Sequence, residues 1–155
     1  MTLYFAYGSN MQRGAMKARC PNARAIGPAG LAGYRFFVGF DGWGSVKPSP
    51  GGIVHGVLWK LTPRDIAALH AYELLHKGLY DVRHLPVRLG SRRVTAMLYL
   101  LRRRAPGRPK PGYVEMIAAA ARGWKLPTRY IRSVERWSVS RWTGTRVIED
   151  FGELA

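Results

Sequence analysis

The chain has 155 residues, 47% of them apolar, and carries 25 Lys and Arg against nine Asp and Glu, a formal net charge of +16. This length and apolar content fit one folded domain and exclude a wholly disordered chain. No apolar run reaches the roughly 18–20 residues of a membrane span, and a single cysteine, Cys20, excludes an intrachain disulfide, so we expect a cytoplasmic protein without a membrane segment.

The first third of the chain predicts strands, because short apolar and aromatic runs are bounded by turn-forming residues. These strands cover residues 3–7, 34–40 and 53–61. The first runs into the turn Gly8-Ser9-Asn10, and a short helix over residues 11–19 follows it. Residues 41–52 hold two prolines and four glycines, which predicts a long surface loop that contains Asp41.

A helix is predicted from residue 62 to about Leu75. Thr62 is a capping residue, Pro63 suits the first helical position, and Asp65 completes a variant of the capping box. On this helix Glu73 falls within the apolar stripe that contains Leu69. We therefore expect its carboxylate to point inward.

The second half of the chain predicts a β-hairpin followed by helices. Strands over 79–89 and 92–102 flank the two-residue turn Gly90-Ser91. A basic, proline-rich connector leads to a helix over 113–124 and another that ends near residue 136. The order of elements predicts an α+β fold with a small mixed, barrel-like sheet and flanking helices, in a domain over 1–140 with a tail over 141–155.

Glu73 is the candidate general base. A partly buried carboxylate loses hydration, which raises its pKa toward the range where it exchanges a proton near neutral pH. The alternative is a structural role, in which Glu73 pairs with His70, His76 or Lys77. The other carboxylates have simpler interpretations as caps, loop residues, polar helix positions or tail residues.

The turn Tyr7-Gly8-Ser9-Asn10 is the candidate binding loop. Glycine permits a positive φ that exposes successive N–H groups, and the Ser and Asn side chains add donors, so the turn can hold a carboxylate or an oxyanion. The alternative is that these residues serve only the turn. Tyr80, Tyr99 and Tyr113 fit core positions and pocket walls equally well.

Metal and cysteine chemistry find no support in the sequence. The four histidines lack the close spacing of zinc sites, and Cys20 is interpreted as a small buried hydrophobe. We expect an enzyme without a metal or another cofactor.

Several motifs together resemble the γ-glutamylcyclotransferase-like (AIG2-like) family. The resemblance spans about residues 3–136 and is carried by Leu3 to Asn10, Val54-His55-Gly56-Val57-Leu58-Trp59, Tyr72-Glu73, Gly78-Leu79-Tyr80, Tyr99-Leu100, Tyr113 and Gly123-Trp124-Lys125-Leu126-Pro127. It implies a small mixed barrel and the cyclisation of a γ-glutamyl amine or amide to 5-oxoproline, with release of the amine.

The resemblance also implies roles for individual residues. Glu73 would be the proton acceptor, and the γ-glutamyl group would be held by Tyr4, Phe5, Ala6, Tyr7, Gly8, Ser9 and Asn10, with Tyr113 lining the pocket. Two positions depart from the family pattern, where an acidic residue is common at the place of His70 and a glycine at the place of Leu74. A charged His70 close to Glu73 would lower the pKa of the carboxyl.

The rival hypothesis is a non-catalytic basic module that binds nucleic acid or an acidic partner. Its candidate segment is Arg102-Arg103-Arg104 with Arg108 and Lys110. The prolines stiffen this segment and no nucleic-acid motif accompanies it. We expect at most weak, non-specific binding of nucleic acid beside a small-molecule γ-glutamyl substrate. The oligomeric state is open.

Overall fold

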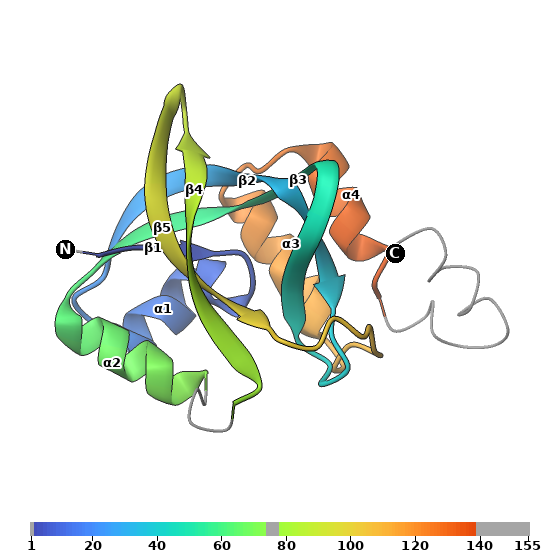
Figure 1. Cartoon of the computed structure of the whole chain (residues 1–155), viewed down its shortest axis with the longest axis horizontal. Helices are drawn as coiled ribbons and strands as arrows, with labels where there is room; N and C mark the ends of the chain where they lie inside the picture. Colours follow the sequence, from blue (N-terminus) through green and yellow to red (C-terminus); the bar gives the residue numbers. More distant parts are fainter. Residues whose placement is uncertain (1, 74–77, 139–155) are drawn as a thin grey trace, which may run out of the picture.

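A closed five-stranded barrel forms the centre of the molecule (Figure 1). The structure, a computed structural model, describes residues 2–73 and 78–138. In order around the barrel the strands are β1 (Thr2–Ala6), β3 (Gly44–Leu61), β2 (Arg24–Val38), β4 (Tyr80–Leu89) and β5 (Arg92–Leu101). Neighbouring strands are antiparallel except β1 and β5, which pair in parallel at Tyr4 and Met97. The expected α+β fold with a mixed barrel is confirmed.

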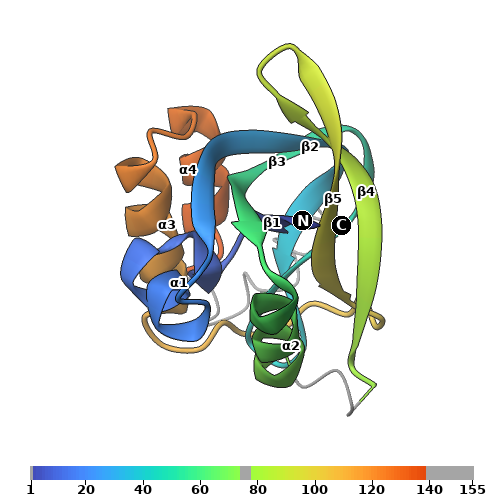
Figure 2. The same ribbon diagram turned by 90° about the vertical axis from the view of Figure 1, so that its left-hand side faces the viewer.

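Helices flank the barrel on two sides, as Figure 2 shows. They are the short 3-10 turn η1 (Ser9–Met11), α1 (Arg13–Arg19), α2 (Pro63–Tyr72), α3 (Tyr113–Gly123) and α4 (Thr128–Glu135). In that view α1, α3 and α4 gather on one side of the strands, and α2 lies below them. None of the helices in the described residues is long and apolar enough to cross a membrane.

The predicted loop over residues 41–52 is wrong, because β3 already begins at Gly44. From Gly44 to Ile53 this strand pairs with β2, whereas its pairing with β1 begins at Val57. Before Val57 β3 is paired with β2 alone, so its other edge has no neighbouring strand that needs N–H donors. Pro48 and Pro50, which lack the N–H group, are therefore accepted in this part of the strand.

Local signals predicted the start of α2 and the hairpin turn, but some element boundaries differ from expectation. The side chain of Thr62 accepts from the N–H of Asp65 at 3.2 Å, and the Asp65 carboxylate accepts from the N–H of Thr62 at 3.0 Å, which confirms the capping box. The helix nevertheless ends at Tyr72, and Leu75, its expected end, lies outside the described residues. The hairpin turns at Gly90, whose φ is +62°, and β2 begins ten residues before the expected Tyr34.

The core fills the barrel and the space under the helices. Large fully buried side chains come from β1, α1, β2, β3 and β5, and include Phe5, Met16, Phe37, Leu58 and Leu98. This packing places η1 between the C-terminal end of β1 and α3, where the candidate site lies. The expected tail over 141–155 falls outside the described residues.

Candidate active site

A cavity of about 380 Å³ opens at the C-terminal end of β1. Segments from all along the chain line it: β1 and η1, the turn between β2 and β3, the end of α2, the strands β4 and β5, and the first residue of α3. The lining residues are Tyr4, Tyr7, Gly8, Ser9, Asn10, Asp41, Trp43, Gly44, Tyr72, Glu73, Leu79, Tyr80, Tyr99 and Tyr113.

The structure brings most of the expected site residues together. Seven of them line the cavity: Tyr4, Tyr7, Gly8, Ser9, Asn10, Glu73 and Tyr113. Phe5 and Ala6 belong instead to the fully buried core of the barrel and are not among the lining residues. Tyr80 and Tyr99, for which core and pocket positions were both open, lie in the cavity wall.

Glu73 caps the C-terminal end of α2, where its N–H donates to the carbonyl of Leu69 at 2.8 Å. The side chain is half-buried. Loss of hydration raises the pKa of this carboxyl to about 7, Arg19 opposes the rise, and Asp41 adds to it. A carboxyl with this pKa can accept a proton and return it near neutral pH.

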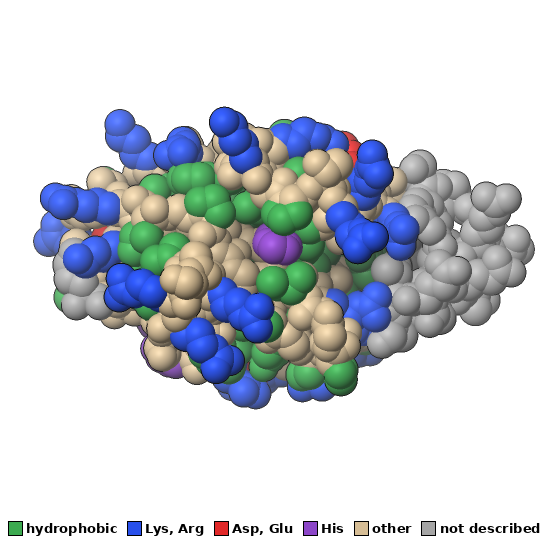
Figure 3. Space-filling view, turned by 90° about the horizontal axis from the view of Figure 1, so that it is seen from above, with side chains coloured by type: hydrophobic (Ala, Val, Ile, Leu, Met, Phe, Trp, Pro, Cys, Tyr) green, Lys and Arg blue, Asp and Glu red, His purple; other side chains and the backbone are tan. Residues whose placement is uncertain are grey.

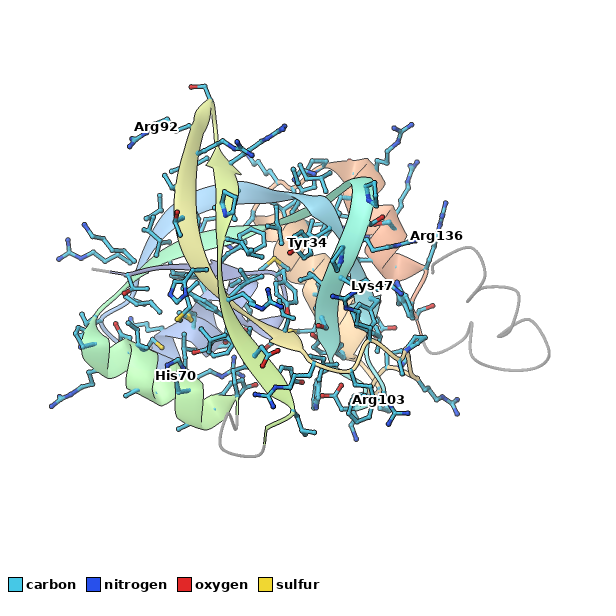
Figure 4. All side chains as sticks on the ribbon, viewed as in Figure 1. Tyr34, Lys47, His70, Arg92, Arg103 and Arg136 are labelled. Carbon is cyan, nitrogen blue, oxygen red and sulfur yellow. The ribbon has the colours of Figure 1, made fainter. Side chains whose placement is uncertain are left out.

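The alternative pairing of Glu73 with His70 is not what the structure shows. The Nδ1 of His70, labelled on α2 in Figure 4, lies 2.7 Å from the Tyr99 hydroxyl. Within the described ranges Glu73 forms no ion pair. His76 and Lys77, the other partners named in that alternative, lie outside the described residues, and so does Leu74.

The binding turn differs from expectation at Gly8, whose φ is −118° and therefore not positive. A side chain there is disfavoured for another reason: a Cβ at Gly8 would lie 3.0 Å from the Tyr113 hydroxyl oxygen, a tight contact that requires Tyr113 to shift. After Gly8 the chain forms η1, in which Met11 N–H donates to the Gly8 carbonyl at 3.1 Å. The first N–H groups of such a turn have no partner within it, which leaves those of Ser9 and Asn10 available to a ligand.

Arg19 supports this turn through side-chain contacts, a role that sequence reasoning missed. Its guanidinium lies 3.4 Å from Ser9 Oγ, donates to Asn10 Oδ1 and stacks 3.8 Å above the Tyr72 ring. With its oxygen held in this way, the Asn10 amide donates from Nδ2 to the Tyr4 hydroxyl at 3.0 Å. Nothing in the sequence marks Arg19, because a cation in the last turn of a helix is ordinary.

Two tyrosine hydroxyls are arranged as donors toward the cavity. The Tyr4 oxygen accepts from Asn10, and the Tyr113 oxygen accepts from the N–H of Gly44 at 2.9 Å. Each hydroxyl keeps its own proton for a further hydrogen bond. Burial raises the pKa of both hydroxyls well above the usual value, so they remain protonated.

Asp41 is the second carboxylate of the cavity, and its role was also missed. Its Oδ1 accepts from the N–H of Trp43 at 3.1 Å, and its Oδ2 accepts from the Tyr80 hydroxyl at 2.5 Å. The composition of residues 41–52 predicted a surface loop, so the carboxylate was interpreted as a loop residue. Only the pairing of β2, β3 and β4 brings it to the cavity.

Other candidate groups lie elsewhere. Cys20 is buried, its thiol is 3.5 Å from the main-chain oxygen of Asp65, and burial raises the pKa of the thiol to about 11, which keeps it unreactive. Among the described residues no group of three or more His, Cys, Asp or Glu side chains could hold a metal ion.

The positive charge is spread over the surface. Figure 3 shows Lys and Arg side chains across a whole face with little acidic surface between them. Figure 4 places Arg92, Arg103 and Arg136 at well-separated points. In the basic connector Arg102 pairs with Asp81 at 2.5 Å, and Arg103 lies 5.0 Å from the centre of the Phe40 ring. The side chains of Arg102 and Arg103, two of the cations on which the nucleic-acid hypothesis depends, are therefore already in contact with other side chains.

Comparison with known proteins finds one family. Residues 4–121 match the family described as gamma-glutamyl cyclotransferase, AIG2-like. A Homo sapiens protein named gamma-glutamylcyclotransferase is 28% identical over 163 residues, which cover 98% of this chain and 86% of that protein. A Mus musculus protein of the same name is 30% identical, with 83% and 74% covered.

The fold leads to the same relatives. A solved structure named gamma-glutamyl cyclotransferase is similar with a TM-score of 0.83 and 27% identity, and the match covers 97% of this chain and 96% of that one. A second, titled as an ensemble refinement of an uncharacterized protein from Homo sapiens, has a TM-score of 0.82 and 28% identity over the same shares.

Proposed function

Because the chain belongs to the AIG2-like gamma-glutamyl cyclotransferase family, we propose that it converts a γ-glutamyl amine into 5-oxoproline and the free amine, with Glu73 as the proton-transfer group. The enzyme is of the γ-glutamylcyclotransferase type. The observation that carries the assignment of Glu73 is its position: a half-buried carboxyl with a pKa of about 7 in the wall of the cavity beside the turn after β1. A cytoplasmic location is part of the proposal and agrees with the lone, buried Cys20.

The reaction needs little from the protein, because the substrate carries its own nucleophile. The α-amino nitrogen attacks the γ-carbonyl carbon, a C–N bond closes the five-membered ring, and the C–N bond to the amine breaks. Two protons leave the α-ammonium and two reach the departing nitrogen, so no water is consumed. The protein must fold the substrate, move protons and stabilise the oxyanion.

Glu73 suits the proton transfer. With a pKa of about 7 the carboxyl is substantially ionised at neutral pH and still basic enough to take a proton from the α-ammonium. The same group, once protonated, gives the proton to the leaving nitrogen. Burial raises this pKa and Arg19 lowers it, and the balance keeps it near the pH at which both steps proceed.

The γ-glutamyl group is proposed to lie at the inner end of the cavity. The hydroxyls of Tyr4 and Tyr113 and the N–H groups of Ser9 and Asn10 supply donors there for the α-carboxylate and for the carbonyl oxygen that becomes negative. A cavity of about 380 Å³ is in the range of small-molecule sites. The hydrogen bonds through Asn10 and Gly44 fix both tyrosine hydroxyls before the substrate arrives.

The test is release of 5-oxoproline from a panel of γ-glutamyl amines and γ-glutamyl amino acids. Wild-type protein should release it from at least one member, and Glu73→Gln should not. Glu115→Gln, a change of the same kind at an exposed position on α3, is the matched control and should keep full activity. Equal activity in Glu73→Gln and Glu115→Gln would remove Glu73 from the mechanism.

A further inference from the structure

The cavity has an inner end and a rim with different chemistry. Tyr4, Tyr7 and Tyr113 are at most 8% exposed, whereas Trp43, Tyr72 and Leu79 are 45%, 46% and 42% exposed. The second group therefore marks where the cavity meets solvent. If the γ-glutamyl group lies at the inner end, the released amine lies toward this aromatic and aliphatic rim.

Asp41 is held rigidly among these rim residues. It belongs to the tight turn between β2 and β3, which is closed by the hydrogen bond from Gly39 N–H to the Trp43 carbonyl at 2.8 Å. Gly42 in that turn has a φ of +88°, and the connector donates from Lys110 N–H to its carbonyl at 3.1 Å. A carboxylate on such a support keeps its direction when a ligand arrives.

The Asp41 carboxylate retains capacity for a ligand. It accepts one hydrogen bond from Trp43 N–H and one from the Tyr80 hydroxyl. A carboxylate offers about four acceptor positions, so two partners leave room for donors on a bound molecule. Tyr80 and Trp43 add aromatic rings to the same region, and aromatic rings beside a carboxylate are a favourable environment for an ammonium group. The ring of Tyr72 already carries the Arg19 guanidinium.

The charge of the cavity is opposite to that of the molecule. The chain carries a formal charge of +16. In the part of the cavity wall that the structure describes, the carboxyl groups are those of Asp41 and Glu73, and no Lys, Arg or His side chain lines it. Arg19 is not among the lining residues, and its guanidinium is engaged with Ser9, Asn10 and the ring of Tyr72.

From this arrangement we infer that the preferred substrates are γ-glutamyl derivatives of alkyl diamines, whose second, free ammonium group is bound by Asp41 and the rim aromatics. The inference rests on the proposed function and names the class of amine released. The Asp41 carboxylate attracts the free ammonium group and repels an amine that carries its own carboxylate. It therefore favours cationic substrates and disfavours anionic ones. The alkyl chain between the two nitrogens passes the apolar surface of the rim.

The experiment compares three substrates of similar length that differ in the charge at the far end. They are the mono-γ-glutamyl derivatives of 1,4-diaminobutane (cationic), of pentylamine (neutral) and of 5-aminopentanoic acid (anionic). For the wild-type enzyme we expect kcat/KM for the cationic compound to exceed that for the neutral one by roughly 10- to 100-fold, the range of a hydrogen bond to a charged group. The anionic compound should be the poorest.

Asp41→Asn is the decisive variant, since the amide keeps the shape and still accepts from Tyr80 and Trp43. We expect the ratio of kcat/KM between the cationic and the neutral compound to fall toward one. Glu115→Gln, which removes a charge from the exposed face of α3, should keep the wild-type ratio. A thermal melt of each variant shows that the folded fraction is the same.

The contrary results are distinct. An equal loss on all three compounds in Asp41→Asn would place Asp41 at the γ-glutamyl group that they share and overturn the inference, while the proposed function stands. A wild-type preference for the anionic compound would overturn it without any variant. Release of 5-oxoproline from none of these compounds or of the wider panel would instead remove the proposed function itself.

Discussion

Replacement of Glu73 by Gln is the sharpest test of the proton-transfer role. The amide keeps the size of the side chain but cannot carry the proton. We expect kcat to fall by at least the roughly 10²–10⁴-fold that general acid–base catalysis contributes, with KM little changed. Wild-type kcat/KM should rise with pH through about 7, the pKa of Glu73, because only the ionised carboxylate is a base. This limb should be absent from any residual activity of the variant.

The same substitution should leave the fold stable. Burial raises the pKa of Glu73 from 4.5 to about 7, so the native state holds the proton over a pH range in which the unfolded chain has lost it. The contribution of Glu73 to wild-type stability therefore falls as pH rises from about 4.5 to about 7. Above about pH 7 this group causes no further loss. A shift of this size corresponds to at most about 3 kcal/mol, and the partial exposure of the side chain reduces it.

Urea or thermal unfolding at pH 5 and pH 8 measures this effect beside the 5-oxoproline assay. Glu73→Gln should lack most of the wild-type loss of stability between these values and be more stable than wild type at pH 8 by about 1–3 kcal/mol. The reasoning would be refuted by a variant that unfolds more easily at pH 8 yet turns over normally per folded molecule. That result would identify Glu73 as one half of a structural ion pair.

Three further predictions concern the surroundings of the site. Gly8→Val should abolish activity, because the new Cβ would lie 3.0 Å from the Tyr113 hydroxyl oxygen. The control Gly14→Val, on the exposed face of α1, should keep full activity. Full activity in Gly8→Val would show that the turn is only structural. Arg19→Met should move the rising limb of the kcat/KM pH profile to higher pH, since the guanidinium lowers the pKa of Glu73. The control Arg13→Met removes the same charge beside Trp124 and should not move the limb. Identical pH profiles for the two variants would contradict this prediction. Binding of oligonucleotides, followed by fluorescence anisotropy, should be weak, independent of sequence and lost as salt is raised, and salt-resistant, sequence-selective binding would favour the rival hypothesis.

Features set by neighbouring residues could be predicted from the sequence. The capping box at Thr62 and the hairpin turn at Gly90 depend on contacts within a few residues, and both were found where expected. The strand before Gly8 and the inward position of Glu73 also follow from local pattern. The overall barrel was expected from the order of elements together with the family resemblance.

Features that depend on residues far apart in the sequence could not be predicted. Pro48 signals a loop by composition, and only the free edge of β3 makes it acceptable in a strand. Asp41 and Arg19 gain their roles through contacts with Tyr80 and Asn10 that no local pattern announces. At Gly8 the expected positive φ was wrong. The close approach that favours glycine there comes from Tyr113, 105 positions later in the chain.

The parallel pairing of β1 with β5 makes the site a late product of folding. The cavity takes Tyr7, the residue after β1, and Tyr99 from β5, and the Tyr7 hydroxyl donates to the main-chain oxygen of Tyr99. Contacts so far apart along the chain form slowly, since their loop-closure entropy is lost before they stabilise anything. In a refolding experiment catalytic activity should therefore return when the barrel closes, after the β4–β5 hairpin and the helices have formed. The rate at which turnover returns would then measure the rate of that last step.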